Sequence, residues 1–310
     1  MSNNRVYLMM VFTALFWSGA FITGKLAVKE FPAFALTFFR FLFGLPFIFT
    51  ILYLRQPNNW LPQKRQWPPL IVLGIIGTFL YHGLFFSCLK YTTAINSSLI
   101  GATNPMVTVV LATLFFHEKI TLSRAGGIVL SFLGVFLTVT NGDWAVITGF
   151  KLNIGDILMF AAVCSWAVYS ILSRIIMVKY QLTPLVLTAY TFLVCTVAAV
   201  PFVIWENPAT YLPQTTVGGW LSILYMTIFA SVLGYLFQLI AIQKIGASKA
   251  AIFINLVPVF TIGQAVLILG ESLSLMKILS AGIIISGVYL TIRPRVATLA
   301  SVELVKRNIS

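Results

Sequence analysis

Long apolar stretches alternate with short polar joints along most of the chain. A helix needs about 20 mainly apolar residues to cross the hydrocarbon core of a bilayer, and ten such stretches fit here. The pattern predicts helices over residues 6–27, 34–54, 70–90, 94–116, 123–141, 153–177, 184–205, 218–241, 247–269 and 275–293. The longest joints, 55–69 and 206–217, contain several Asn and Pro residues and are expected at the surface. The predicted fold class is an all-α integral membrane protein with ten transmembrane helices.

Composition supports this prediction and excludes several functional classes. Of 310 residues, 59% are hydrophobic and 9% are charged, far from the balance of a soluble protein. The three cysteines, Cys88, Cys164 and Cys195, lie in apolar stretches at unrelated spacings, so neither a disulfide nor a metal site is predicted. We find no paired acids, no Ser/His/Asp set and no ATP-binding loop, so we expect neither an enzyme nor a cofactor.

The distribution of Lys and Arg predicts the orientation in the membrane. Counted alternately across the ten helices, fourteen fall on one side, while five fall on the other: Lys25, Lys29, Lys90, Lys151 and Lys277. Because cytoplasmic loops retain positive charge, both termini are expected in the cytoplasm, with the protein in the plasma membrane. The net charge of +13 then reflects topology and contact with the lipid bilayer, not nucleic acid. The oligomeric state is left open, and a monomer is compatible with these features.

The two halves of the chain repeat the same pattern. A shift of 153 residues aligns Pro105 with Pro258 and Glu118 with Glu271, and a shift of 149 aligns Trp17 with Trp166. The repeating unit has five helices. Because five is an odd number of crossings, the second copy enters the membrane from the opposite face and is inverted relative to the first. The expected organisation is therefore two inverted five-helix repeats, a design common among carriers. They occupy residues 1–141 and 153–293, joined by an outer loop at 142–152 and followed by a cytoplasmic tail at 294–310.

Each repeat carries a proline in the middle of its fourth helix, Pro105 or Pro258, where it is expected to bend the helix. Asn104 and Asn255 lie beside these kinks. Two interpretations stand equally: the amides face a substrate, or they bond to backbone groups that the prolines free. Small residues at every fourth position of these helices, such as Ser98 and Ala102, and the glycines of the fifth and tenth helices are expected to allow close helix packing.

These features resemble the drug/metabolite transporter superfamily, in its ten-helix EamA-like branch. The stretches NPMVTVVLATLFFHEKITLSRAGGIVLSFLGVFL and VPVFTIGQAVLILGESLSLMKILSAGIIISGVYL are similar to the ends of that branch's two repeats, and the resemblance extends over about residues 6 to 293. It implies a carrier with a central cavity lined by the first, third and fourth helices of each repeat. It also implies export of amino acids or other metabolites.

The candidate substrate-binding residues are aromatic and polar side chains on these cavity-forming helices. An indole offers a flat apolar face and one hydrogen-bond donor, so the matched tryptophans are the best aromatic candidates. The full set is Trp17, Tyr81, His82, Asn104, Trp166, Tyr169, Tyr235, Gln238 and Asn255.

Ionisable groups at membrane depth cost about 2.5 to 3.5 kcal/mol each on insertion scales. Arg40 is expected either to bind a substrate carboxylate or, as we favour, to be a structural arginine that snorkels to the interface or bonds to backbone carbonyls. His82 either accepts a proton near neutral pH or packs as a neutral group. Glu118 and Glu271 end their helices at the interfaces, where we expect them to anchor or gate the next helix through its N-terminal amides.

The leading functional prediction is a secondary transporter that exports a small neutral or zwitterionic metabolite, such as an amino acid, by alternating access. The alternative is an efflux carrier for drug-like or cationic amphiphilic compounds, held by cation–π contacts. The lack of a buried acid weighs against this alternative.

Overall fold

The computed structural model of the protein describes residues 3–116, 121–143, 153–245, 250 and 253–292. These residues form helices and, within the described ranges, no β-strand. The helices are α1 (Asn3–Ala27), α2 (Ala33–Arg55), α3 (Trp67–Leu73), α4 (Tyr81–Tyr91), α5 (Ala94–Gly101), α6 (Asn104–Phe116), α7 (Leu122–Thr140), α9 (Ile154–Tyr180), α10 (Pro184–Trp205), α11 (Pro208–Tyr211), α12 (Val217–Tyr225), α13 (Gly234–Ile245), α15 (Leu256–Gln264) and α16 (Leu275–Ile292). Short 3₁₀ turns occupy Lys64–Gln66 and Leu212–Gln214, and π-helical segments occupy Gly74–Leu80, Met226–Leu233 and Ala265–Leu269.

Seven helical segments among the described residues are long and apolar enough to cross a membrane. Two of them include π-helical segments: Lys64–Tyr91 contains α3 and α4, and Val217–Ile245 contains α12 and α13. Three shorter apolar helices lie where the remaining spans are predicted, at 125–140, 256–269 and 275–291. The prediction of an all-helical, multi-pass membrane protein is therefore confirmed, whereas the count of ten spans stays a prediction.

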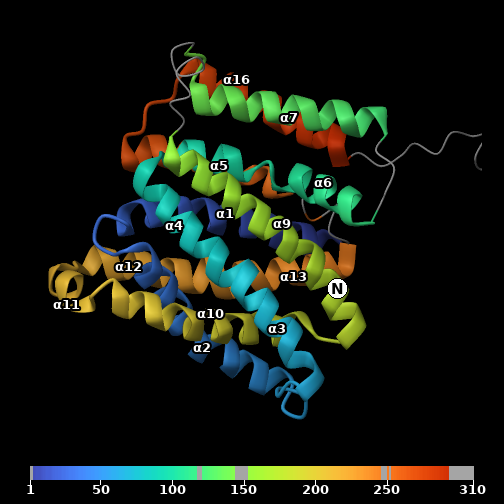
Figure 1. The fold of residues 1–310 in the computed structure, drawn as a ribbon, viewed down its shortest axis with the longest axis vertical. Helices are drawn as coiled ribbons and strands as arrows, with labels where there is room; N and C mark the ends of the chain where they lie inside the picture. The colour runs from blue at the N-terminus through green and yellow to red at the C-terminus, as the bar shows by residue number, and fades with distance from the viewer. Residues whose placement is uncertain (1–2, 117–120, 144–152, 246–249, 251–252, 293–310) are drawn as a thin grey trace, which may run out of the picture.

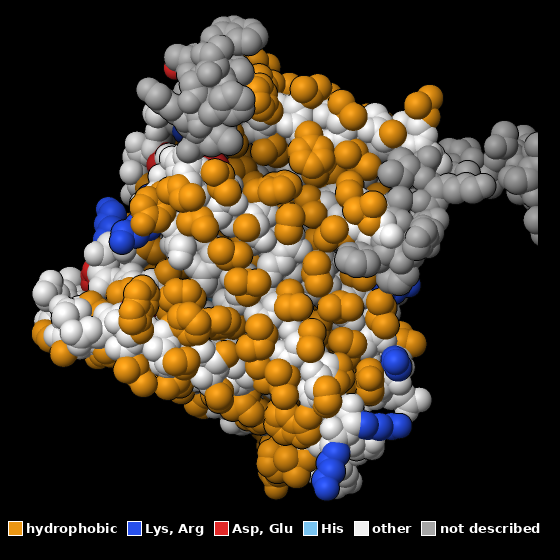
Figure 2. Space-filling model, in the orientation of Figure 1, with side chains coloured by type: hydrophobic (Ala, Val, Ile, Leu, Met, Phe, Trp, Pro, Cys, Tyr) orange, Lys and Arg blue, Asp and Glu red, His pale blue; other side chains and the backbone are white. Residues whose placement is uncertain are grey.

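The surface of the bundle is largely apolar, as contact with the hydrocarbon core of a bilayer requires. Large apolar side chains such as Leu122, Trp205 and Leu267 are more than three-quarters exposed. Apolar side chains cover most of the visible face, and the Lys and Arg side chains gather toward two opposite edges (Figure 2). A broad exposed apolar surface between two charged edges is stable in lipid but not in water.

Polar caps begin several of these helices. The side chains of Thr93, Asn153, Thr183 and Thr216 accept hydrogen bonds from backbone N–H groups in the first turns of α5, α9, α10 and α12. Each cap satisfies an N–H group that has no partner within its own helix. The polar joints of the sequence therefore fix where the spans begin.

The helices lie side by side in a bundle (Figure 1). Helices α7 and α16 pair along one edge, and α2 and α10 pair along the opposite edge. Two apolar clusters form the core, one centred on α1, α4 and α5 and the other on α2, α10 and α13. Trp17 and Tyr81 pack against both clusters, so these two side chains mark the seam between them.

The predicted helix 94–116 is broken rather than bent. Helix α5 ends at Gly101, a turn includes Ala102 and Thr103, and α6 begins at Asn104, so Pro105 lies in the first turn of a new helix. Its missing N–H costs nothing there, which is why proline is favoured at that position. Pro258 likewise lies in the first turn of α15, which begins at Leu256. The expectation of a continuous kinked helix was wrong for residues 94–116.

Close contact between α7 and α16 depends on particular glycines. A Cβ atom added at Gly127 would lie 2.6 Å from the carbonyl oxygen of Gly287, and one added at Gly134 would lie 3.0 Å from the backbone nitrogen of Ile284. Gly126 and Gly282 have open space instead. The predicted close packing is thus confirmed at Gly127, Gly134 and Gly287, but it was wrong at Gly126 and Gly282.

We predict that Gly127→Ala destabilises the protein by about 1 to 3 kcal/mol, because the added methyl group forces α7 away from α16. Gly126→Ala is the matched control: it adds the same atom one residue earlier, into open space, and alanine favours the helix. Thermal unfolding in detergent measures both variants. Equal unfolding temperatures for the two would contradict the close contact.

Candidate functional site

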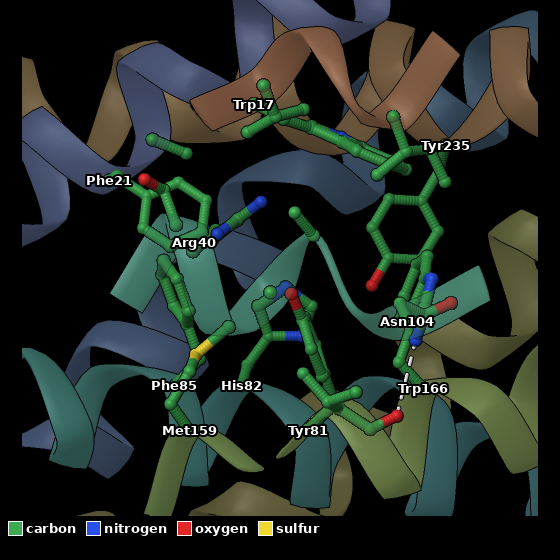
Figure 3. Close-up of a pocket in the computed structure, with 17 residues that line it drawn as sticks. Trp17, Phe21, Arg40, Tyr81, His82, Phe85, Asn104, Met159, Trp166 and Tyr235 are labelled. Carbon is green, nitrogen blue, oxygen red and sulfur yellow. Dashed lines mark hydrogen bonds between the residues drawn. The ribbon is translucent and has the colours of Figure 1, made fainter. Parts of the chain in front are cut away.

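A cavity of about 60 Å³ lies at the seam between the two apolar clusters. Its wall is contributed by α1, α2, α4, α5, α6, α9, α13 and the region of α15. The lining residues are Trp17, Ala20, Phe21, Arg40, Tyr81, His82, Phe85, Ser98, Gly101, Ala102, Asn104, Met159, Val163, Trp166, Tyr235, Ile254 and Val257. Figure 3 shows their side chains around a common space. The volume is enough for a few water molecules, so this arrangement of the helices is nearly closed around the site.

The cavity brings together most of the residues that the sequence singled out. Six of the nine candidates line it: Trp17, Tyr81, His82, Asn104, Trp166 and Tyr235. The other three are buried but do not line it: Tyr169, Gln238 and Asn255. Pro105 and Pro258 are not part of the wall, although each adjoins a residue that is.

Aromatic rings in mutual contact form much of this wall. The rings of Trp17 and Trp166 meet edge to face with centroids 5.7 Å apart, and the Tyr235 ring lies 5.2 Å from Trp166. Tyr81 approaches Trp166 to 4.8 Å from the other side. Tyr169 supports the wall from behind, with its ring 5.0 Å from Trp166. The two tryptophans that the sequence matched between its halves therefore meet at one site.

The π-helical segments shape the cavity by leaving carbonyl groups available to side chains. The indole N–H of Trp17 donates to the carbonyl oxygen of Ala230 at 3.0 Å, within Met226–Leu233. In a second π-helical segment, Gly74–Leu80, Ser165 donates to the carbonyl oxygen of Ile76 at 2.6 Å. Gly77 lets this segment approach α9, because any Cβ there would collide with the Tyr169 ring. Trp17 is thus held in place by its own polar atom.

His82 is fully enclosed at the same site. It is 2% exposed, and its Nδ1 atom lies 2.7 Å from the carbonyl oxygen of Thr78. Because a carbonyl only accepts, Nδ1 carries a proton and donates it, and in a neutral ring the Nε2 atom is left as the acceptor. The rings of Phe41 and Tyr81 each lie 4.7 Å from the imidazole, both edge to face.

Arg40 adds a guanidinium to the wall from α2. It is 2% exposed and its Nε donates to the hydroxyl oxygen of Ser231 at 2.6 Å. Thr227 donates to the backbone carbonyl of Arg40 at 2.9 Å, so α2 is fastened to Met226–Leu233 at this depth. The guanidinium carbon lies 5.6 Å from the ring centre of Phe41 and 5.8 Å from that of Phe86. The second span therefore contributes to a cavity that the resemblance assigned to the first, third and fourth helices of each repeat.

The two asparagines differ in their partners. The Asn104 side chain donates to the carbonyl oxygen of Val163 in α9 at 3.2 Å, and Thr108 donates to Asn104 at 3.4 Å. Asn104 thus bonds to a neighbouring helix while it also lines the cavity. The side-chain oxygen of Asn255 is buried without a partner among the described residues.

Sequence reasoning missed some of the lining residues and the partner that holds Arg40. Ser98 and Ala102 were assigned to helix packing, yet both line the cavity. Ser231 was not singled out, although the 153-residue shift matches it with Thr78, another hydroxyl residue in a π-helical segment. The hydroxyl residue at both matched positions was the sequence signal that could have identified Ser231. Met159 carries no pattern that distinguishes it from core.

Carboxylates close the bundle at the edge that carries the α1–α2 and α4–α5 joints. Glu271 accepts hydrogen bonds from the backbone N–H groups of Ala94 and Ile95 at 2.7 and 3.0 Å, at the start of α5. We expected Glu271 to contact the next helix along the chain. This expectation was wrong, because the carboxylate contacts α5, which is far away in sequence. A carboxylate at a helix N-terminus is favourable because it meets both free N–H groups and the positive end of the helix dipole. Glu118, the matched residue, lies outside the described residues.

Two further carboxylates act in the same way at this edge. Glu206 accepts from the backbone N–H groups of Phe34 and Ala35 at 3.0 and 2.7 Å, at the start of α2. Glu30 accepts from the N–H and the hydroxyl of Thr216, which caps α12, at 2.7 and 2.8 Å. Each of the three carboxylates joins segments from different halves of the chain.

Glu206 also borders a larger hollow, of about 720 Å³, whose wall includes Glu30, Lys29, Lys90 and Tyr211. Burial raises the pKa of the Glu206 carboxyl above its ordinary value, against the opposite effect of the two backbone hydrogen bonds. The closed arrangement therefore retains a proton on Glu206 to a higher pH than a glutamate free in water would.

Comparisons with protein families, with individual proteins and with solved structures give consistent results. The model of the EamA-like transporter family matches residues 4–140 and again residues 153–293. The uncharacterized transporter YyaM of Bacillus subtilis is 32% identical over 288 residues, which cover 93% of each chain. A protein of Salmonella typhimurium named a probable amino-acid metabolite efflux pump is 25% identical, over 89% of this chain and 91% of its own. One crystal structure shares the fold, with a TM-score of 0.67 at 20% identity over 98% of this chain and 99% of its own.

We predict that Glu271→Gln loosens the start of α5 and exposes Cys88, because the amide turns an NH₂ donor toward backbone donors. Cys88 is fully buried, and its sulfur lies 3.5 Å from the hydroxyl oxygen of Ser97 in α5. A membrane-impermeant maleimide should label Cys88 several-fold faster in this variant than in the wild type, as measured by mass spectrometry.

The control for this labelling is Glu30→Gln, which removes a carboxylate from α12 and leaves α5 untouched. A Cys88→Ala variant identifies the background from the other two cysteines. If Cys88 of a folded Glu271→Gln variant reacted no faster than in the wild type, the carboxylate would not hold α5 in place.

Proposed function

The chain belongs to the EamA-like transporter family, and from this membership we propose that it is a secondary transporter that exports a small neutral or zwitterionic metabolite, such as an amino acid. The observation that carries the proposal is the aromatic cavity, which lies where helices from both halves of the chain meet. The name of the Salmonella relative, a probable amino-acid metabolite efflux pump, supports the substrate class and the direction.

We propose that the two halves are inverted five-helix repeats, over 1–141 and 153–293, related by an axis that passes through the cavity. The family model matches each half separately. The π-helical segments begin 152 residues apart, at Gly74 and Met226, close to the 153-residue shift. Residues that this alignment pairs also meet in space: Trp17 contacts Trp166, and His82 lies 6.0 Å from Tyr235. Only residues close to a two-fold axis contact their own equivalents, which supports an axis at the cavity.

Alternating access follows from this organisation. Two inverted copies have two packings of similar free energy, each of which opens the same site to one side of the membrane. The carboxylate contacts of Glu30, Glu206 and Glu271 close one side in the present arrangement. The Lys and Arg count assigns that side to the exterior, with both termini in the cytoplasm of a plasma-membrane protein. One chain encloses the whole cavity, so a monomer is sufficient for the proposed cycle.

Export of cationic amphiphiles is the weaker candidate. Efflux of a cation is favoured by an acid in the cavity, and the described residues that line it include no acidic side chain. Arg40 instead places a positive charge there. Like charges at close range in a site of low dielectric repel by several kcal/mol.

We predict that purified protein in liposomes exchanges labelled amino acids across the membrane, and that Trp17→Ala or Trp166→Ala slows this exchange about ten-fold or more. These variants remove ring surface from the cavity wall, where a bound solute is desolvated. Counterflow measured with a panel of amino acids tests both parts. Exchange no faster than in empty liposomes, over the whole panel, would refute the proposed function.

Trp205→Ala is the matched control, because this indole is 80% exposed and distant from the cavity wall. It should leave exchange unchanged. Thermal unfolding of each variant separates transport from folding: if Trp17→Ala and Trp166→Ala lose folded protein in proportion to transport, these indoles serve packing alone.

If His82 takes up a proton during transport, we predict that His82→Gln removes the pH dependence of exchange between about pH 5 and pH 8, the range in which histidine ordinarily titrates. Glutamine keeps a donor for the carbonyl of Thr78 and loses the titratable ring. An unchanged pH profile in the folded variant would leave His82 as a neutral packing group.

A further inference from the structure

A buried positive charge, with no acidic partner among the residues that the structure describes, lies in the cavity wall. Arg40 is seven residues into α2, roughly 10 Å from the helix start, and it is 2% exposed. An arginine is charged at every physiological pH and carries five N–H donors. Among the described residues, the one hydrogen bond of its guanidinium is that from Nε to Ser231. The two terminal nitrogens therefore have donors to offer.

The structural explanations favoured from the sequence do not account for this arrangement. A snorkelling arginine reaches the interface and is exposed there, whereas Arg40 is enclosed. A carbonyl-bonded arginine has backbone oxygens as acceptors, and the described residues provide its guanidinium with none. The rings of Phe41 and Phe86 lie near the outer limit for cation–π contact. Aromatic faces at this distance offset part of the cost of burial and leave the N–H groups unpaired.

The guanidinium reaches into the space among the labelled rings (Figure 3). A second unpaired group borders the same space: the hydroxyl of Tyr235, which is 1% exposed and has no partner among the described residues. Guanidinium and phenol are both donors that suit a carboxylate. Most of the remaining wall is apolar, with flat faces from Trp17 and Trp166, and its other polar residues are Tyr81, His82, Ser98 and Asn104.

Among the described residues that line the cavity, none is an acid that could pair with a substrate amine. The chain has seven acidic residues, and the five that the structure describes do not line the cavity. Glu30, Glu206 and Glu271 are engaged at helix N-termini, and Asp156 accepts from the hydroxyl of Thr92 at 2.6 Å. The charge of the site is thus complementary to an acid, while an ammonium group meets aromatic faces and neutral acceptors such as Nε2 of His82.

We propose that Arg40 is the receptor for a substrate carboxylate, and that the protein recognises a small carboxylic acid with a flat apolar body. This inference rests on the proposed function and narrows it, because the carboxylate rather than the amine of the solute is recognised. Neutral solutes and cationic amphiphiles are then poor substrates, and amino acids with aromatic side chains are good ones.

Four probes with the same phenethyl body test the proposal: 3-phenylpropanoate, phenylalanine, phenylalaninamide and phenethylamine. Ligands that bind the folded state raise its unfolding temperature. We expect the two carboxylates to stabilise the purified wild-type protein at concentrations at least ten-fold lower than the amide or the amine. An equal or larger response to the amide or the amine would overturn the proposal without any variant.

Variants then assign the preference to the guanidinium. Arg40→Gln should remove the difference between 3-phenylpropanoate and phenylalaninamide, and Arg40→Lys should retain part of it, because the charge remains. Arg55→Gln is the matched control, an exposed arginine at the other end of the same helix, and should keep the full difference. Size-exclusion chromatography checks folding. A folded Arg40→Gln variant that still prefers the acid would refute the role of Arg40.

The same thermal unfolding measurement shows whether Arg40 binds a carboxylate or a simple halide ion. In sulfate buffer, stabilisation by sodium chloride that Arg40→Gln abolishes, with no response to 3-phenylpropanoate, would overturn the carboxylate assignment. Liposome exchange distinguishes a failure of the carboxylate proposal from a failure of the proposed transport function. Exchange without preference for acids would refute this inference and leave the proposed function standing, whereas no exchange of any solute would refute the proposed function itself.

Discussion

Polar groups of the backbone that are freed inside a bilayer must find partners within the protein, and this constraint organises the centre of the molecule. The two π-helical segments beside the cavity break the regular α-helical ladder, and side chains use the carbonyls there. Ser165 bonds to Ile76, His82 to Thr78 and Trp17 to Ala230. Two of these three bonds run from the first helix of one half to the third long helix of the other half. The groups that satisfy the backbone are therefore also the groups that hold the cavity wall, so the geometry of the cavity is fixed by the requirements of the fold.

A different solution operates at the edge of the bundle, where water is close. There the free N–H groups at the starts of α2, α5 and α12 meet Glu206, Glu271 and Glu30, each from the other half of the chain. Such contacts are strong enough to hold two halves together, yet water can replace them at modest cost. The interior contacts have no such substitute. A bundle with exchangeable contacts at its edge and permanent ones at its centre is suited to opening at the edge while the centre keeps its shape.

The sequence predicted the spans and much of the cavity because both leave periodic or repeated signals. Hydropathy located the long helices, and the repeat paired Trp17 with Trp166, which do meet. Contacts that depend on the relative placement of distant helices left no such signal. Glu271 was assigned to the next helix because spacing shows only neighbours, whereas its partners are Ala94 and Ile95. Likewise, Gly126 and Gly127 are indistinguishable in sequence, and only the backbone of α16 makes one of them indispensable.

Two pairs of rings in the cavity wall, Trp17 with Trp166 and His82 with Tyr235, are matched between the two halves, but the charge of the wall is not. The position that corresponds to Arg40, where LTFFRF faces LTAYTF, is Thr191, whose hydroxyl donates to the carbonyl of Thr188 in its own helix. The site therefore combines paired rings from both halves with a charge from one half only. Arg40 is in turn fastened to Met226–Leu233 through Ser231 and Thr227, so α2 of the first half is bound to a helix of the second half at the depth of the charge. Because a single guanidinium marks one end of the cavity, a solute with one charged end has one favoured orientation there. It keeps that orientation only if the helices that carry Arg40 and Ser231 move together when the bundle opens.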